Sequence, residues 1–136
     1  MMMNAVFPSR IHRTLVATAL VLAPLAADAG DAARGKKIFE QCRYCHDPLP
    51  DAPLAAPDLK GVFGRPAGAV PGYRYSDAMA AKNRAGLIWT EENLHAFVRN
   101  PKGFVPGTVM PFKGVKRKSM REDLFTYLKT LGTTND

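Results

Sequence analysis

Cysteine is scarce in this sequence, and that scarcity limits what the chain can be. Its 136 residues include 2 cysteines, too few for a disulfide-dense scaffold or for a zinc site of four thiolates. Acidic side chains are also in deficit, with 12 Asp and Glu against 19 Lys and Arg and a formal net charge of +7. The sequence has no internal repeat, no alternating strand pattern and no apolar run of the ~20 residues that cross a membrane. Since 46% of the residues are apolar, we expect one small globular domain.

The N-terminal segment differs in composition from the rest and has the pattern of a secretory signal peptide. Arg10, His12 and Arg13 give a basic start, residues 14–25 are almost wholly apolar, and residues 27–29 offer a cleavage site. We therefore expect residues 1–29 to be removed on export and residues 30–136 to form the mature domain in the periplasm. If the signal is not cleaved, the same domain would be tethered to the membrane.

Apolar periodicity and capping residues predict three helices in the first part of the mature chain. Asp31 is placed to cap the first helix and Thr90 to cap the third, while Pro101 ends or offsets that third helix. The predicted segments are residues 31–44, 76–85 and 90–100.

A final helix is predicted near the C-terminus, and long loops are predicted between the helices. Ser119 and Glu122 form a capping box before a leucine stripe, and Gly132 supplies the stop. Prolines and glycines predict extended loops over residues 47–57 and 61–72.

Residues 42–46 read Cys-Arg-Tyr-Cys-His, and this pentad contains the side chains that most clearly indicate a cofactor site. On a helical turn, its spacing places the thiols of Cys42 and Cys45 and the imidazole of His46 on one side. The thiols can then bond two vinyl groups at a haem edge while the imidazole meets the iron, which is the signature of c-type haem attachment. The alternatives are a disulfide or a thioredoxin-like redox motif, but the latter needs a βαβ setting that this sequence lacks. We expect one covalently attached haem c.

An electron carrier also needs a sixth iron ligand, and a thioether favours ferrous iron and raises the reduction potential. Of the mature methionines, Met120 opens the final helix and suits a core position, while Met79 lies in a short helix of uncertain register. Met110 is favoured because a proline- and glycine-rich segment would present its side chain on a stiff loop. His95 lies off the apolar face of its helix, so we expect it to face solvent rather than iron.

The sequence resembles the class I cytochromes c over nearly all of the mature chain. The resemblance implies an all-α fold of about four to five helices and long loops wrapped around one haem. It also implies His46 and Met110 as axial ligands and one-electron transfer rather than an enzymatic reaction. The motifs that carry it are residues 35–39, the pentad, and residues 57–59, 61–65, 71–75, 89, 100–102, 106–110 and 121–124.

The resemblance also implies roles for residues outside the pentad. The Pro57 carbonyl would accept the second ring N–H of His46, and Arg65, Tyr75 and Trp89 would surround the haem propionates, where a buried carboxylate needs donors. Thr108 belongs to the motif before Met110 and is counted with the haem-binding residues. Plain core packing is the alternative for Trp89. The residues expected to join the first and last helices are Gly35, Phe39, Leu124 and Tyr127.

Three departures from the family pattern affect the surroundings of Met110. The spacing between Phe39 and the first cysteine is one residue shorter than in mitochondrial members, which points to the bacterial branch. The segment from residue 75 to residue 89 is longer than the mitochondrial pattern, so either Met79 or Asn83 takes the position of a haem-side asparagine. Phe97 stands where the family often has a tyrosine.

The resemblance implies an exposed haem edge with a basic ring that docks on acidic surfaces of redox proteins. Gln41 and Val109 replace two lysines of that ring, and a solvated basic surface without docking function is the alternative. Binding to nucleic acid is not expected, because the chain is exported and has no Lys/Arg run interleaved with aromatics. The matching cations are Lys102, Lys116, Arg117 and Lys118.

The sequence therefore predicts a monomeric, soluble periplasmic carrier between redox complexes such as those of a respiratory chain. One alternative is a haem subunit of a larger oxidoreductase, which would copurify with a catalytic chain. Another is a haem enzyme or gas sensor, which needs an open iron position.

Overall fold

The computed structural model describes residues 30–46 and 55–132, so the expected signal peptide and most of the loop at 47–57 lie outside the described residues. Within these ranges the backbone forms helices and no strand, apart from an isolated antiparallel bridge between Pro66 and Ile88. The all-α prediction is confirmed. The helices are α1 (Ala32–His46), α2 (Asp77–Arg84), α3 (Glu91–Arg99), α4 (Pro101–Phe104) and α5 (Lys118–Gly132).

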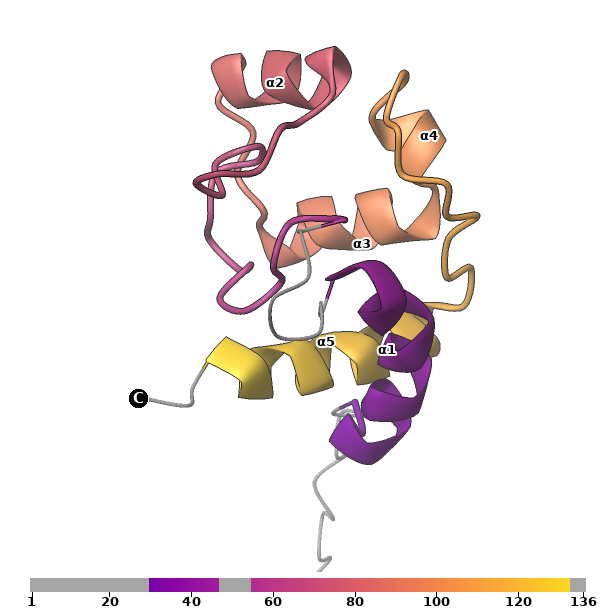
Figure 1. Ribbon diagram of the computed structural model, residues 1–136. Helices are drawn as coiled ribbons and strands as arrows, with labels where there is room; N and C mark the ends of the chain where they lie inside the picture. Colours follow the sequence, from indigo (N-terminus) through magenta and orange to yellow (C-terminus); the bar gives the residue numbers. More distant parts are fainter. Residues whose placement is uncertain (1–29, 47–54, 133–136) are drawn as a thin grey trace, which may run out of the picture.

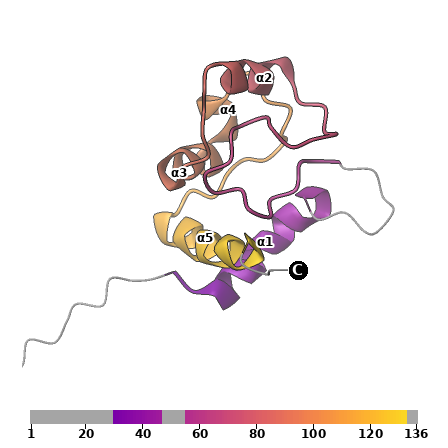
Figure 2. The same cartoon turned by 90° about the vertical axis from the view of Figure 1, so that its left-hand side faces the viewer.

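The helices are arranged in two groups (Figure 1). α1 lies against α5, and this is the most extensive helix–helix contact. α3 packs against α5 and α4, while α2 lies at the far end of the molecule, as the second view also shows (Figure 2). None of the described helices has the length and apolar character of a membrane span.

A glycine allows α1 and α5 to approach closely. A Cβ atom at Gly35 would collide with the carbonyl oxygen of Asp123 and come within 2.8 Å of the Tyr127 side chain. One turn later the Phe39 ring packs against Tyr127 with centroids 5.3 Å apart. The contact between the first and last helices that the sequence predicts is therefore confirmed.

A buried carboxylate fastens the start of α1 to α5. Asp123 is 6% exposed, and its oxygens accept from the Asp31 amide at 2.7 Å and from the Arg34 guanidinium at 2.9 and 3.0 Å. These donors, Arg34 first, hold the pKa of Asp123 below its usual value. The ionised carboxylate is thus part of the helix–helix contact.

Of the three caps that the sequence predicts, those at Asp31 and Thr90 are confirmed, and the structure adds one at Ser76. The side chains of Asp31, Ser76 and Thr90 accept from backbone amides three residues later, at 2.9, 3.2 and 3.2 Å. α1 runs to His46, slightly beyond the expected end near residue 44. Each of these side chains satisfies a backbone donor that the helix itself leaves unpaired.

The predicted capping box of the last helix is wrong. α5 begins at Lys118, and the Arg121 amide already donates to Arg117 O at 3.3 Å, which places Ser119 inside the first turn. Pro101 ends α3 as expected and also opens α4, where Asn100 caps the Gly103 amide at 3.3 Å.

The core lies between the two helix groups and reaches from α1 and α5 to α2 and α3. Phe125 is the largest of its fully buried side chains. The buried apolar residues of this cluster are Phe39, Val62, Ala67, Met79, Trp89, Leu94, Phe97, Val105, Leu124, Phe125 and Leu128.

Candidate haem site

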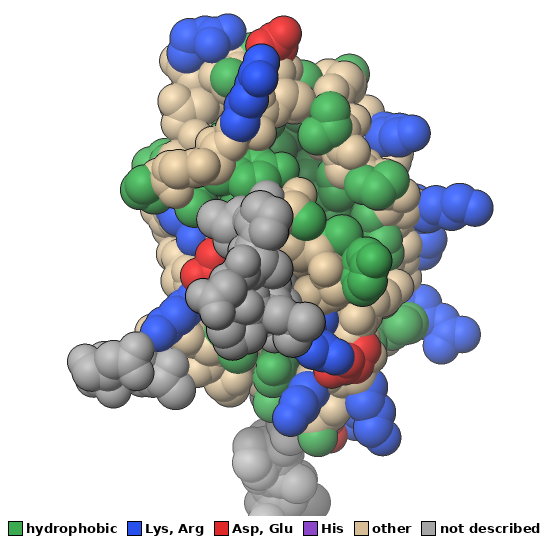
Figure 3. Space-filling model, in the orientation of Figure 1, with side chains coloured by type: hydrophobic (Ala, Val, Ile, Leu, Met, Phe, Trp, Pro, Cys, Tyr) green, Lys and Arg blue, Asp and Glu red, His purple; other side chains and the backbone are tan. Residues whose placement is uncertain are grey.

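A cavity of ≈ 370 Å³ opens between the two helix groups. Hydrophobic side chains gather around a hollow on the face seen in Figure 3, and lysines and arginines project from the margins of that face. All nine sequence-predicted site residues line the cavity: Cys42, Cys45, His46, Pro57, Arg65, Tyr75, Trp89, Thr108 and Met110. The structure therefore brings the whole predicted set to one place.

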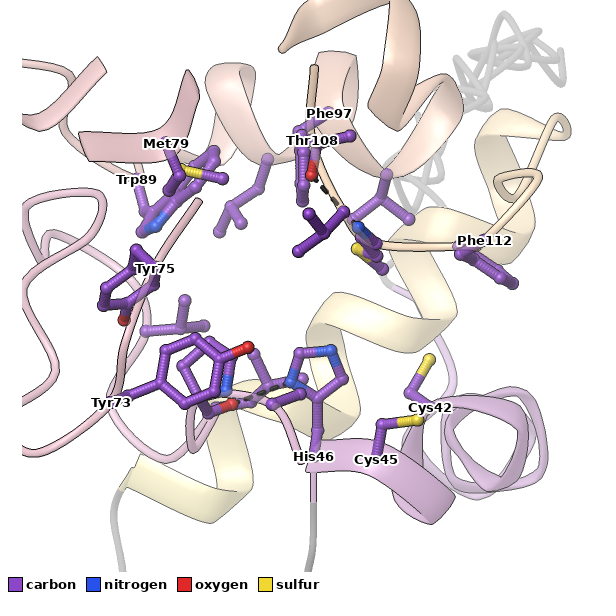
Figure 4. A pocket seen from close by; sticks show the side chains of 18 of the residues that line it. Cys42, Cys45, His46, Tyr73, Tyr75, Met79, Trp89, Phe97, Thr108 and Phe112 are labelled. Atoms are coloured by element: carbon purple, nitrogen blue, oxygen red, sulfur yellow. Dashed lines mark hydrogen bonds between the residues drawn. The ribbon is translucent and has the colours of Figure 1, made fainter. Parts of the chain in front are cut away.

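The C-terminal end of α1 supplies the attachment chemistry. Cys42, Cys45 and His46 lie within one helical turn, and Figure 4 shows both thiols and the imidazole at the same side of the cavity. Both thiols are free, so the disulfide alternative is not supported. Burial, with a smaller effect of Cys45, raises the pKa of Cys42 to about 11, which keeps its sulfur protonated at neutral pH.

One ring nitrogen of His46 is held by the backbone. His46 Nδ1 donates to Pro57 O at 2.7 Å, which fixes the ring orientation and leaves Nε2 for another partner. Burial lowers the pKa of His46 despite the opposing effect of the Pro57 carbonyl, so the neutral imidazole is favoured. A neutral, oriented imidazole is the form that binds a metal.

Arg65 supports the loop that carries Pro57. Its guanidinium donates to Asp58 O at 2.6 Å and to Lys60 O at 3.1 Å, and its side chain also borders the cavity. Arg65 thus orders the backbone next to the acceptor of His46.

Thr108 and Met110 form the opposite wall. Thr108 Oγ1 accepts from the Met110 amide at 3.3 Å, and the Thr108 amide donates to Val105 O at 3.0 Å. In Figure 4 Thr108 faces the cavity from the side opposite His46. The Met110 thioether and the His46 imidazole therefore come from different segments that line the same cavity.

Aromatic side chains close the remaining side. Tyr75 Oη accepts from the Val70 amide at 3.2 Å, and burial raises the pKa of Tyr75, so its phenol keeps the proton that it can donate. Trp89 is 7% exposed, and its ring is tilted against that of Phe97 with centroids 5.0 Å apart, so it packs in the core as well as lining the cavity.

The sequence-based site omitted several residues that line the cavity. Tyr73 is the most informative, because its ring centroid lies 4.7 Å from that of Tyr75 and it lines the cavity together with Tyr75 (Figure 4). Its position in the Pro-Gly-Tyr-Arg-Tyr motif was the available signal. Ser76 and Phe112 also line the cavity, but no sequence pattern singled them out.

Met79 and Asn83 differ in burial and hydrogen bonding. Met79 is 8% exposed and lines the cavity, whereas the Asn83 amide donates to Ala67 O at 2.6 Å. Phe97 is also buried against the cavity. Met79 and Phe97 therefore both present apolar side chains to the cavity, whereas Asn83 does not line it.

His95 differs from its prediction. The sequence predicts a solvent-facing side chain, but His95 is half-buried, its ring lies 4.5 Å from Phe125, and Nδ1 accepts from Arg121 Nε at 3.1 Å. The prediction failed because α5 packs against this side of α3, which the helical pattern of α3 alone does not reveal.

These residues fit a haem. The cavity walls are largely apolar, two free thiols stand at the edge, and a neutral imidazole and a thioether also line the cavity. This donor set suits iron in a porphyrin whose ring needs an apolar, water-poor surrounding.

Comparison with known proteins gives the same result, although no family model matches the chain. The chain is 47% identical to cytochrome c of Euglena viridis over 103 residues, which span 75% of this chain and 98% of that protein. It is 44% identical to cytochrome c2 of Rhodomicrobium vannielii over 121 residues, covering 88% and 94% of the two chains. The solved structure of cytochrome cH from Methylobacterium extorquens matches with a TM-score of 0.65 and 40% identity, over 74% of this chain and 99% of that one.

The fold and the thiol-edged cavity define a c-type haem protein that transfers electrons rather than an enzyme. Identity at this level over nearly the full length of the relatives takes the assignment one step further. The chain belongs to the class I cytochrome c family and carries covalently bound haem c.

Proposed function

We propose that this protein is a periplasmic one-electron carrier in which His46 and Met110 are the axial iron ligands and Cys42 and Cys45 form the thioether bonds. One observation supports the proposal: the imidazole of His46, oriented by Pro57, and the thioether of Met110 line the same largely apolar cavity. When bound, the haem supplies an iron that alternates between the ferrous and ferric states.

The protein side chains in this proposal orient, bind and exclude water. Pro57 keeps the His46 proton on Nδ1, and Thr108 restrains the Met110 backbone, so both donor atoms stay in place in either oxidation state. Permanent ligation keeps the structural change on electron transfer small. Tyr75 and Trp89 supply O–H and N–H donors for the haem carboxylates, and Arg65 adds positive charge nearby.

The test of the ligand pair is the visible spectrum of the oxidised and reduced holoprotein. Ferric haem bound by a thioether has a weak near-red band, which we expect in the native protein and not in Met110→Ala. Met120→Ala is the matched control, because Met120 does not line the cavity. A second control, Met79→Ala, removes a thioether that does line it. Loss of the band in Met79→Ala but not in Met110→Ala would refute the assignment, and an absent band in native protein would favour an open-iron sensor or enzyme.

The proposed location depends on residues 1–29, which have the composition of a signal peptide. Cleavage after Ala29 would leave Gly30 at the N-terminus. N-terminal sequencing of holoprotein from a periplasmic extract should begin at Gly30. An intact N-terminus in the membrane fraction would instead indicate a tethered carrier.

The proposed docking face is the rim of the cavity, where apolar and basic side chains meet. Val109 is 71% exposed, and Lys102 and Arg117 are exposed beside the cavity-lining segment. Lys116 Nζ donates to Arg99 O at 2.8 Å, and Lys118 pairs with Glu122 at 3.1 Å, so these two cations are partly engaged within the protein. An acidic redox partner should bind this rim transiently. Electron-transfer rates that do not change with ionic strength would exclude electrostatic docking.

A further inference from the structure

Arg121 is a buried cation whose hydrogen-bond acceptors are all uncharged atoms. The side chain is 7% exposed. Its Nη1 donates to Val115 O and Lys116 O, both at 2.8 Å, and its Nε donates to His95 Nδ1 at 3.1 Å. A buried guanidinium depends strongly on each acceptor, because a donor left without a partner in the interior is costly.

The two carbonyl acceptors belong to the segment that connects Met110 to α5. The Val115 amide donates to Val98 O at 2.9 Å, and Lys116 Nζ donates to Arg99 O at 2.8 Å, so the same short stretch is fastened to α3. Arg121 fastens that stretch to α5. Hydrogen bonds therefore connect residues 115–116, which lie between Met110 and α5, to both α3 and α5.

The third acceptor, His95, can accept only while Nδ1 carries no proton. Its ring lies between α3 and α5, 4.5 Å from the Phe125 ring. Burial and the charge of Arg121 lower the pKa of His95, Lys118 acts in the same direction, and Glu91 and Glu122 act against it. The neutral form is thus the one that the folded protein selects at neutral pH.

We infer that His95 is an acid-sensitive positioning residue: uncharged, it holds Arg121 against the backbone of residues 115–116, and protonation releases that backbone. A protonated His95 would present a second positive charge to Arg121 and remove one of its acceptors. The segment after Met110 would then loosen, together with the basic run at residues 116–118. The hydrogen bonds of Arg121 do not depend on whether Met110 binds iron, but the effect on Met110 ligation rests on the proposed function.

The first test uses the complete holoprotein and measures hydrogen exchange at the Val115 amide. From about pH 7.5 to about pH 5, we expect its protection factor to fall roughly tenfold, because one acceptor of a buried charged donor is lost. His95→Gln keeps an oxygen acceptor but does not titrate in this range, so its Val115 protection should be nearly independent of pH. Equal pH dependence in both proteins would overturn the inference.

A second measurement keeps the inference falsifiable if His95→Gln folds poorly. The ring ¹⁵N resonances of His95 in the native holoprotein should show an unprotonated Nδ1 and a protonated Nε2 at neutral pH. A ring protonated on Nδ1 at that pH would contradict the hydrogen bond from Arg121 and end the proposal.

The near-red band separates this inference from the proposed ligation. If both hold, the band weakens in acid more in the native protein than in His95→Gln. If Met110 is not a ligand, the band is absent at every pH while the Val115 exchange still responds to acid.

Discussion

The two walls of the haem cavity are built in different ways. The His46 wall is the end of α1, a helix of 15 residues that packs along α5. The Met110 wall is an irregular segment over residues 110–116. Its amides donate hydrogen bonds to Thr108 Oγ1 and Val98 O, and two of its carbonyls accept hydrogen bonds from Arg121. One wall is set by local helix geometry and close helix packing, and the other by scattered tertiary contacts.

This difference has a consequence for stability. Contacts of α1 with α5 belong to the core and are lost only when the molecule unfolds, whereas a segment without regular structure can open locally at lower cost. We therefore expect changes at the His46 wall to act on global stability and changes at the Met110 wall to act first on iron ligation. Four substitutions test this contrast.

The largest effect is expected at the close approach of α1 and α5. Gly35→Ala places a Cβ atom against the Asp123 carbonyl, and we expect a loss of about 3 kcal/mol in the free energy of unfolding. Gly132→Ala in α5 is the control, since its Cβ would meet only Gly61 at 3.4 Å. Urea unfolding of both holoproteins measures the difference. Similar midpoints would show that the α1–α5 contact relaxes easily.

A matched change on the other wall is Gly114→Ala. Gly114 has φ +95 and a Cβ there would also collide with Arg99 O, so we expect a loss of about 2 kcal/mol and a clear weakening of the near-red band. The control is Gly61→Ala, which has φ +65 and open space around the added Cβ. If Gly61→Ala weakens the band equally, the close contact at Gly114 does not position the Met110 segment.

Acid should weaken the α1–α5 contact that supports the His46 wall, because the ionised Asp123 carboxylate takes part in that contact. Its pKa lies below the ordinary value of 3.8, so its contribution to stability is complete above about pH 4 and is lost as the pH falls through the lower folded pKa. Asp123→Asn should lower the urea midpoint at neutral pH and reduce its further decline in acid. Glu92→Gln, which removes an exposed carboxylate from α3, should change neither. An unchanged acid response in Asp123→Asn would show that other carboxylates control it.

The smallest effect is expected at the exposed rim of the Met110 wall. Val109→Lys adds a cation at a 71% exposed position, and we expect a few-fold faster association with an acidic redox partner at low salt. Ala33→Lys adds the same charge at an exposed position of α1 that does not line the cavity. Stopped-flow electron transfer at several salt concentrations compares the two. Equal acceleration by both would indicate a general charge effect rather than a docking rim.

The parts of the site that local helix geometry fixes could be predicted from the sequence, and the parts that tertiary contacts fix could not. The pentad at residues 42–46 is predictable because helix geometry alone brings its three functional side chains together. Met79 and Asn83 could not be distinguished from sequence, because the choice depends on which face of α2 meets the cavity. The burial of His95 is not predictable for a related reason, since its partner Arg121 is distant in the sequence and reaches it only when α5 packs against α3.

The sequence by itself determined the all-α class, most helix starts, the thiol and imidazole cluster and the short list of candidate thioether ligands. These features depend on neighbouring residues, whose relative positions the backbone of one helix or turn fixes. The tertiary structure decided which methionines line the cavity with His46, which polar groups reach that cavity, and that a buried arginine holds the segment after Met110. Those outcomes depend on residues distant in the chain, and only the packing of the two helix groups brings them within bonding distance.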